Sequence, residues 1–289
     1  MDAVLLAQPL ERMGVPFVCE INTAMGPEYA AKGRPLRGRL YDSFQGRTLS
    51  KSAGWLVMTP ELTTYAERLS GVRRPTLLAK NGFNPSRTAP RTTREEARQR
   101  LEVDPAVPVL VMAGFSRPWH GADRAIEMLT ELPQGTVLWL IGSRGPEDEA
   151  TTKRYAQDRG VTESVRVFPW LSEEALSDLI VAADVGLGAL ALDRKQFFGQ
   201  ALKIPLYLAL GVPVLINSAD FRLDSAGPFV KCVLSQDPKA LAAGVRALLD
   251  ISEACREEAK EFAHRYLTWQ VAARETSEFL AAVLGGLGR

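Results

Sequence analysis

Short apolar runs alternate with amphipathic segments along most of the chain, which is typical of a parallel sheet wound with helices. In the second half, six runs predict buried strands at 108–114, 137–142, 165–169, 185–190, 213–217 and 229–234. Amphipathic segments predict helices between them, at 121–132, 148–160, 172–183, 202–211 and 237–250. This half therefore predicts one complete doubly wound domain of about six strands.

The first part of the chain shows the same pattern less completely. VPFVCEI (15–21) and GWLVMT (54–59) predict strands, and PELTTYAERLSG (60–71) predicts a helix that ends at a glycine. PTLLAKNGFNP (75–85) ends in an Asn-Gly turn, and the polar, proline-punctuated stretch after it predicts a domain junction. The region before residue 85 is expected to hold at most half of a second doubly wound domain.

Composition places the chain among water-soluble globular proteins. It has 289 residues, 46% hydrophobic and 24% charged, which is enough for two domains. The net charge of +1 provides no overall field that favours nucleic acid or an anionic membrane, so any anion is expected to be bound locally.

The three cysteines and the absence of long apolar runs indicate the compartment. Cys19, Cys232 and Cys255 lie far apart without metal-type spacing, so buried thiols in a reducing compartment are expected. No apolar run reaches the roughly 18 residues of a membrane span, and no basic segment precedes a signal-type apolar stretch. A cytoplasmic protein is predicted, and peripheral docking on the inner face of a membrane remains open.

Ligands of open parallel sheets bind at the carboxyl ends of the strands, so the loops there are candidate sites. The first loop, AGFSRPWHGAD (113–123), contains Gly114, Arg117, Trp119 and His120. Arg117 and His120 could supply charge-assisted bonds to a phosphate. Alternatively, Trp119 caps the core and Arg117 is a solvated loop cation. With only two histidines in the chain, a multi-histidine metal site is not expected.

Two further loops add candidate chemistry. Pro169 and Trp170 end a predicted strand, where the backbone could hydrogen-bond a planar base and the indole could stack on it; packing alone is the alternative for Trp170. The loop FFGQA (197–201) leads into a helix that is predicted to begin near Leu202 or Lys203. Its amides could hold a diphosphate that Lys203 neutralises, or the loop is simply tight and the lysine snorkels.

These loops, in this order, resemble the nucleotide-sugar-binding domain of family 4 glycosyltransferases, which have the GT-B fold of two Rossmann-like domains. AKNGFNP is similar to the family's Asn-Gly crossover, GFSRPWHGAD to its phosphate loop, LIGSRGPEDE to its Gly-x-Gly-Pro turn, and VFPWLSEEALSDLIVAADVGL to its base-binding segment. GQALKIPLYLALGVPVL is similar to its Lys-x-x-Glu segment, and RYLTWQVAARETSEFLAAVL to its C-terminal tryptophan and last helix. The resemblance covers nearly the whole chain.

The resemblance implies an α/β, GT-B-like fold with one complete Rossmann-like domain and one partial N-terminal one. The expected bounds are 1–84 for the partial, acceptor-side domain, 85–265 for the nucleotide-sugar-binding domain, and 266–289 for a helix that packs back on the first domain. It also implies a retaining glycosyltransferase of polysaccharide or cell-envelope biosynthesis. Such an enzyme uses a nucleotide-diphosphate sugar and a glycan or lipid-linked acceptor, and requires no metal or other cofactor.

By position, the resemblance assigns two sets of donor-binding residues. The diphosphate set is Gly114, Arg117, His120, Gly199, Gln200, Ala201, Leu202 and Lys203. The nucleobase and ribose set is Pro169, Trp170, Leu171 and Leu206. Glu20, Asn22 and Glu28 could line the acceptor side, or belong to a polar strand end and a solvated loop. No catalytic residue is assigned.

The chain departs from the family pattern in three ways. Leu206 replaces the glutamate that holds the donor ribose, and Phe198 replaces an earlier acid of the same segment. His120 replaces the lysine of the phosphate loop. The chain also begins where the family's first domain is about half built. There are three interpretations: the true start lies upstream, a partner covers the exposed sheet edge, or the protein is a degenerate relative.

Two other functions therefore remain beside the transferase. A catalytically impaired nucleotide-sugar-binding pseudoenzyme, or a subunit of another glycosyltransferase, would need only the second domain. A sugar-nucleotide epimerase is a third hypothesis. The sequence lacks both G-x-G-x-x-G after the first strand and G-x-x-x-x-G-K-S/T, which argues against dinucleotide or P-loop chemistry.

Overall fold

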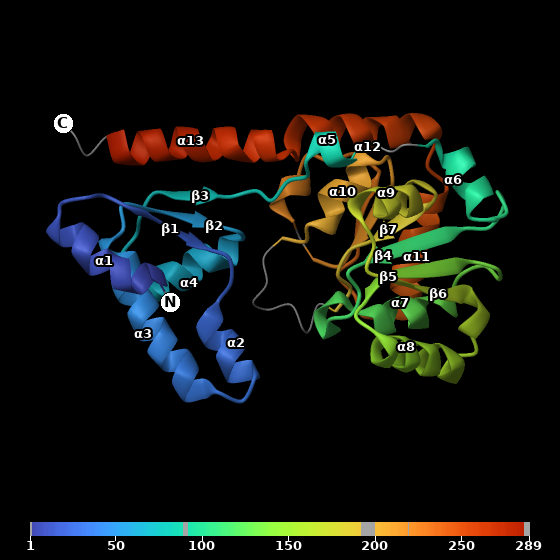
Figure 1. Cartoon of the computed structure of the whole chain (residues 1–289), viewed down its shortest axis with the longest axis horizontal. Coiled ribbons are helices and arrows are strands. Elements are labelled where there is room, and N and C mark those ends of the chain that lie inside the picture. The colour runs from blue at the N-terminus through green and yellow to red at the C-terminus, as the bar shows by residue number, and fades with distance from the viewer. Residues whose placement is uncertain (1, 89–91, 192–199, 219, 286–289) are drawn as a thin grey trace. The chain divides into compact units, whose positions relative to one another are not determined.

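The computed structural model describes residues 2–88, 92–191, 200–218 and 220–285, which divide into two compact units (Figure 1). The smaller unit draws on Met1–Asn81, Phe197–Gln200 and Trp269–Arg289, and the larger on Gly82–Gln196 and Ala201–Thr268. Each unit contains a parallel sheet of its own.

The larger unit is built around a six-stranded sheet. Its strands are β4 (Val109–Ala113), β5 (Val137–Ser143), β6 (Val165–Pro169), β7 (Val185–Leu187), β8 (Val214–Ile216) and β9 (Val230–Cys232). Every pairing is parallel, and the order is β6-β5-β4-β7-β8-β9. All six predicted apolar runs form strands in the order of a Rossmann sheet, so the predicted doubly wound arrangement is confirmed.

Helices surround this sheet, and local sequence fixes where several begin. They are α5 (Pro85–Thr88), α6 (Arg94–Arg100), α7 (Ala122–Leu129), α8 (Pro146–Asp158), α9 (Glu173–Val181), α10 (Lys203–Ala209), α11 (Pro238–Leu249) and α12 (Glu253–Tyr266). Thr93 and Glu96 form a reciprocal capping box at α6. Ser172 caps α9 by accepting a hydrogen bond from the N–H of Ala175.

Both faces of the central strand β4 are buried. Val109, Val111 and Ala113 pack with residues of α10 and α12, whereas Leu110 and Met112 pack on the other face with residues of α7 and α11. A strand covered on both faces has no polar side, which is why it appears in the sequence as a continuous apolar run.

One partly buried carboxylate organises the amino ends of β4 and β7. Asp184 forms ion pairs with Arg94, with Arg98 at 2.6 Å and with Arg256 at 3.7 Å. Its Oδ2 also accepts a hydrogen bond from the N–H of Val109 at 2.8 Å. Burial lowers the pKa of both Arg98 and Arg256, and the nearby Asp184 carboxylate opposes that shift. The carboxylate thus keeps these arginines charged in a dry environment.

The smaller unit contains a three-stranded parallel sheet with the order β1-β2-β3. Its strands are β1 (Val18–Ile21), β2 (Gly54–Val57) and β3 (Thr76–Leu78), and its helices are α1 (Asp2–Arg12), α2 (Met25–Ala31), α3 (Pro35–Lys51), α4 (Pro60–Ser70) and α13 (Trp269–Gly285). Lys80 pairs with Glu275 of α13 at 2.7 Å, and a Cβ on Gly54 would lie 3.0 Å from the ring of Phe279. The last helix therefore packs on this sheet.

Some features were not predicted from the sequence. The helices α1, α2 and α3 were not predicted, and the stretch interpreted as a junction forms α5 and α6. Cys255 is buried and Cys19 is half-buried, but the prediction of a buried thiol is wrong for Cys232, which is exposed. Cys232 ends β9, the last strand in the order of its sheet, where none of the described strands pairs beyond it.

Replacing Asp184 by asparagine tests the arginine cluster. The variant keeps an acceptor for Val109 but leaves the guanidinium group of Arg98 without its carboxylate and Arg256 with only the exposed Glu253 at 3.8 Å. We therefore expect a loss of about 3–5 kcal/mol in unfolding free energy. Urea unfolding measures it. Asp178→Asn, which breaks the exposed pair with Arg100, is the matched control and should cost about 0–1 kcal/mol. Equal losses in the two variants would contradict this account.

Candidate functional site

The loops that follow β4 and β7 meet in the middle of the six-stranded sheet. The two strands are neighbours in the sheet. After β4 the chain continues to β5 and β6 on one side, and after β7 it continues to β8 and β9 on the other side. Ligands of open α/β sheets bind at such a switch point, outside the carboxyl ends of the strands. Here the N–H of Leu190, after β7, donates to the carbonyl of His120, after β4, at 2.8 Å. A main-chain hydrogen bond thus joins the two loops.

Gly121 allows this close approach. It has a φ of +71°, and a Cβ at this position would lie 2.7 Å from the nitrogen of Ala191. Gly121 is also the residue from which α7 begins. A larger residue would be strained in its backbone and would push the two loops apart, so the geometry of this crevice depends on glycine here.

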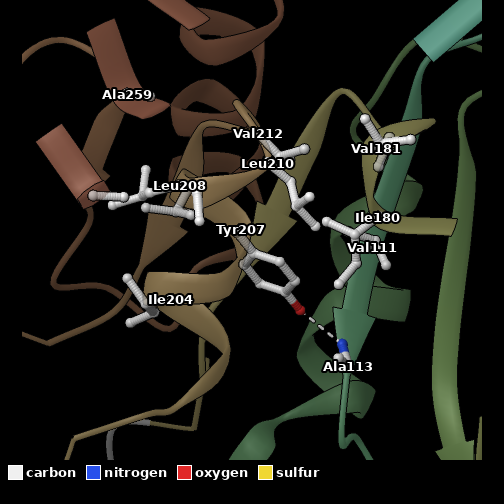
Figure 2. Close-up of a cluster of buried hydrophobic side chains, with 14 of the residues drawn as sticks. Val111, Ala113, Ile180, Val181, Ile204, Tyr207, Leu208, Leu210, Val212 and Ala259 are labelled. Carbon is white, nitrogen blue, oxygen red and sulfur yellow. Dashed lines mark hydrogen bonds between the residues drawn. The ribbon is translucent and has the colours of Figure 1, made fainter. Parts of the chain in front are cut away.

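A buried tyrosine holds α10 against the same two strands (Figure 2). The Tyr207 hydroxyl accepts a hydrogen bond from the N–H of Ala113 at 2.7 Å. Its ring occupies the space that a side chain on Gly186 would need, since a Cβ there would lie 2.4 Å from the ring. Residues four apart share a helix face, so Tyr207 also sets the direction of Lys203.

His120 and Lys203, two of the predicted phosphate ligands, lie together. The Nζ of Lys203 is 3.2 Å from Nδ1 of His120, and Lys203 is only 8% exposed. An ammonium group can only donate, so Nδ1 of His120 is the acceptor where Lys203 is charged. The contact thus places a buried lysine and an imidazole side by side at the crevice, and both side chains can donate to an anion.

Arg117 lies in the loop that ends at His120 but is exposed. Its guanidinium group lies 5.7 Å from the ring centroid of the half-buried Trp119. Arg117 immediately precedes the short 3-10 helix η1 (Pro118–His120), which ends at the histidine. Arg117 is therefore a surface cation at the edge of the crevice, held on an aromatic face.

The candidate base-binding residues lie at the carboxyl end of the same sheet. Trp170 is 79% exposed, and its ring lies near the backbone of Gly142. A Cβ atom added to Gly142 would lie 3.8 Å from the indole of Trp170 and 3.5 Å from the backbone nitrogen of Gly114. The structure thus brings Gly114 and Trp170 into one neighbourhood. The N–H of Gly114 donates to the carbonyl of Ile141 at 2.7 Å, so this glycine offers space rather than a donor.

Pro169 and Leu171 flank the tryptophan differently. Pro169 is exposed at the end of β6, whereas Leu171 is partly buried and packs on the core of the larger unit. An exposed indole between a strand end and a core anchor is available for stacking.

The loop before α10 has two distinct parts. Phe197, Phe198 and Gly199 lie outside the described residues. The side chain of Gln200 donates to the carbonyls of Met58 and Ala79 at 2.8 and 2.6 Å and accepts from the N–H of Asn81 at 2.8 Å, all within the smaller unit. Any contact of Gln200 with a phosphate would therefore use its main chain.

Ala201 and Leu202 belong to the larger unit and lead into α10, which begins at Lys203 as predicted. The carbonyl of Ala201 accepts a hydrogen bond from Arg222 at 3.2 Å. Arg222 is buried and pairs with Asp220 at 2.6 Å. Leu202 is exposed. A buried ion pair thus fixes the backbone just before Lys203.

Leu206 is partly buried and packs against the core cluster that contains Tyr207 and Leu208. It provides an apolar surface where the resembled family has a carboxylate. A leucine cannot accept hydrogen bonds from ribose hydroxyls.

The candidate acceptor-side residues lie in the smaller unit. Glu20 and Asn22 are exposed at and after β1. Glu28 is half-buried on α2 and forms an ion pair with Lys32. Their carboxylates and amide are available at the surface, and the pair with Lys32 partly neutralises Glu28.

Sequence reasoning missed two residues that shape the site, Tyr207 and Arg222. Tyr207 was part of a recognised segment, but nothing in the sequence indicated that its ring fills the space beside Gly186. An arginine two residues after Asp220 was the available signal for a buried ion pair.

Among the described residues, no group of three histidine, cysteine, aspartate or glutamate side chains could hold a metal ion. Within the same residues, no helix is both long and apolar enough to cross a membrane.

Comparison with known proteins identifies related sequences and folds. The family model of glycosyl transferases group 1 matches residues 93–265, more than half of the chain. Among curated proteins, no relative matches the chain.

Three solved structures are similar over nearly the whole chain. Sucrose-phosphate synthase from Thermosynechococcus elongatus has a TM-score of 0.77 at 17% identity, covering 98% of this chain and 72% of that one. Anabaena HepE in complex with UDP has 0.76 at 16%, covering 97% and 76%. WaaG, a glycosyltransferase involved in lipopolysaccharide biosynthesis, has 0.68 at 18%, covering 95% and 80%. The expected GT-B-like α/β fold is thereby confirmed.

The pH dependence of stability tests the Tyr207 contact. Burial raises the pKa of Tyr207 above the ordinary tyrosine value near 10. Above that pH the unfolded chain loses this proton while the folded chain keeps it, so the stabilisation is present below about pH 10 and is lost as pH rises further. Relative to Tyr207→Phe, the wild type should lose about 1.4 kcal/mol per pH unit above about pH 10 in urea unfolding.

Near neutral pH the Tyr207→Phe variant should be less stable by about 1–3 kcal/mol, because the buried N–H of Ala113 loses its acceptor. Tyr266→Phe removes a partly exposed hydroxyl and is the matched control. Parallel stability curves for wild type and Tyr207→Phe at alkaline pH would show that the hydroxyl is not buried as described.

Proposed function

This chain belongs to the family of glycosyl transferases group 1, and from that premise we propose that it transfers a sugar from a nucleotide-diphosphate sugar to a glycan or lipid-linked acceptor. The observation that carries the proposal is the Lys203–His120 pair at the switch point of the sheet. We further propose that transfer retains the anomeric configuration and belongs to polysaccharide or cell-envelope biosynthesis in the cytoplasm, as in the family 4 enzymes that the motifs resemble.

The diphosphate is the part of the donor that this crevice suits best. During transfer, the bond between the sugar carbon and the diphosphate oxygen breaks, and negative charge grows on the leaving group. Lys203 is a buried cation on a helix that Tyr207 holds in place, so it needs no reorganisation to stabilise that charge. His120 and Arg117 would add donors from the neighbouring loop. No metal is required in this scheme.

The nucleoside would extend toward β6. Trp170 offers an exposed aromatic face for the base, and the backbone of Pro169 to Leu171 offers strand-end groups for its edge. The structural neighbour HepE has been crystallised with UDP and with UDP-glucose, which are a nucleoside diphosphate and a nucleotide sugar of the class proposed here.

A second candidate is a nucleotide-sugar-binding subunit with impaired catalysis, and Leu206 is the observation that favours it. Losing a charge-assisted contact to ribose costs about 1.5–3 kcal/mol, or roughly ten- to a hundredfold in affinity. In this alternative the acceptor-side residues Glu20, Asn22 and Glu28 have no catalytic role. A partner protein would then pair with the edge strand β1 and supply the acceptor site.

Calorimetric titration with UDP, GDP and ADP tests the donor site, with Lys203→Met as the variant. We expect one nucleotide to bind, and the variant to bind it at least about tenfold more weakly because a charge-assisted contact to the diphosphate is lost. Lys231→Met, an exposed lysine of β9, is the matched control and should bind like the wild type. Wild-type affinity in Lys203→Met would exclude this lysine from the site.

Restoring an acid at position 206 tests the ribose contact. Leu206→Glu should tighten binding of the preferred nucleotide by about ten- to a hundredfold, since a carboxylate can accept from two ribose hydroxyls. The gain should be largely absent for the 2′-deoxynucleotide and smaller for Leu206→Gln, which lacks the charge. An equal gain with the deoxynucleotide would show that the acid acts elsewhere. Transfer or donor hydrolysis by Leu206→Glu alone would favour the impaired enzyme.

A further inference from the structure

Helix α3 presents three large apolar side chains outward, and only Leu49 in its last turn is buried in the core. Leu36, Leu40 and Phe44 are 78, 56 and 38% exposed. Residues four apart in a helix lie along one side, so these three form a continuous apolar stripe. A helix that packs in a globular unit normally directs such a stripe toward the core, and α3 therefore reverses the usual arrangement.

The inner side of α3 has no room for these residues. A Cβ on Gly38 would lie 2.5 Å from the carbonyl oxygen of Gly26 in α2, and one on Gly46 would lie 2.3 Å from the carbonyl oxygen of Leu69 in α4. Asp42, on the same side, accepts a hydrogen bond from Tyr65. Because glycines bring three helices into backbone contact, α3 cannot rotate to bury its apolar stripe.

Basic side chains surround the stripe. At about 100° per residue, Arg37 and Arg39 flank it on opposite sides and Arg47 lies within it. Arg37 also lies 5.1 Å from the ring centroid of Tyr29. In the described part of the chain, neither Arg39 nor Arg47 forms an ion pair. The α3 face is defined here as these three arginines together with the stripe.

The positive charge is concentrated in this part of the chain. Residues 28–51 contain six basic and two acidic residues, a net charge of +4, whereas the whole chain has +1. Both acids are engaged, Glu28 with Lys32 and Asp42 with Tyr65. Lys32 and Lys51 are paired with Glu28 and Glu11, so the positive charge of the outward α3 face comes from its exposed arginines.

We propose that the α3 face docks on an anionic lipid bilayer. Leu36, Leu40 and Phe44 insert at the boundary between headgroups and acyl chains, while the long arginine side chains reach the lipid phosphates. Clustered arginines match the negative surface potential of such a membrane. The proposal concerns the smaller unit and does not depend on the proposed donor site.

Cosedimentation of the full chain with lipid vesicles tests this inference. We expect binding to vesicles of phosphatidylcholine containing about one third phosphatidylglycerol, and at least about fivefold weaker binding to pure phosphatidylcholine. Binding should weaken in about 0.5 M salt, because screening reduces the attraction of the arginines for the lipids. Nucleotide titration of the same samples reports separately on the donor site.

Two variants of the α3 face carry the test. Leu40→Ser should weaken vesicle binding about tenfold through lost apolar burial, and Arg39→Glu about fivefold or more through charge. The matched controls are Leu234→Ser and Arg144→Glu, exposed residues of the larger unit that should bind like the wild type. All four substitutions are at the surface, and unchanged thermal unfolding verifies that each variant is folded.

Three outcomes would overturn the proposal. The first is no binding of the wild type to anionic vesicles, and the second is equal binding of Leu40→Ser and its control. The third is self-association in analytical ultracentrifugation that Leu40→Ser abolishes while vesicle binding is absent. That result would make the stripe an interface between copies of this chain.

Discussion

Tyr207 fills the space left by the absent side chain of Gly186, and the crevice of the larger unit depends on that contact. The hydroxyl accepts from the N–H of Ala113 at the end of β4, while the ring packs over β7, so one side chain fixes α10 to both strands of the switch point. Lys203 lies one turn earlier on the same helix and is thereby held next to His120. At the opposite end of the same strands, Asp184 neutralises buried arginines and secures α6 and α12. The geometry of the proposed phosphate site is thus a consequence of how the sheet is held at both ends.

The larger unit could be predicted from the sequence because its central strands are covered on both faces. Each appears as a short apolar run, and the helices between them carry clear caps and a single apolar side. The smaller unit could be predicted only in part. In α3, glycines 38 and 46 occupy the buried side and leucines the exposed side, so hydrophobic periodicity does not indicate which way the helix faces. The capping box of Thr93 and Glu96 was present in the sequence, but prolines around it suggested a junction instead.

The candidate site, too, could be predicted from the sequence only in part. The loops, and the start of α10 at Lys203, could be located from strand ends and a family resemblance. Other features depend on tertiary contacts that no local pattern encodes: the engagement of the Gln200 side chain by the backbone of the smaller unit, the burial of Arg222 with Asp220, and the approach of Trp170 to Gly142. The position of Leu206 in the helix could be predicted from the sequence. Whether its side chain faces a bound ribose depends on how much of that side chain the surrounding apolar cluster leaves exposed.

The central claim is that the crevice between the loops after β4 and β7 holds the diphosphate of a nucleotide sugar. A crystal structure of the full chain with its preferred nucleoside diphosphate bound tests this most directly. The account predicts phosphate oxygens within hydrogen-bond distance of Lys203 Nζ and the His120 ring, with the base directed toward Trp170. A nucleotide bound elsewhere, with Lys203 and His120 still in contact only with each other, would contradict it.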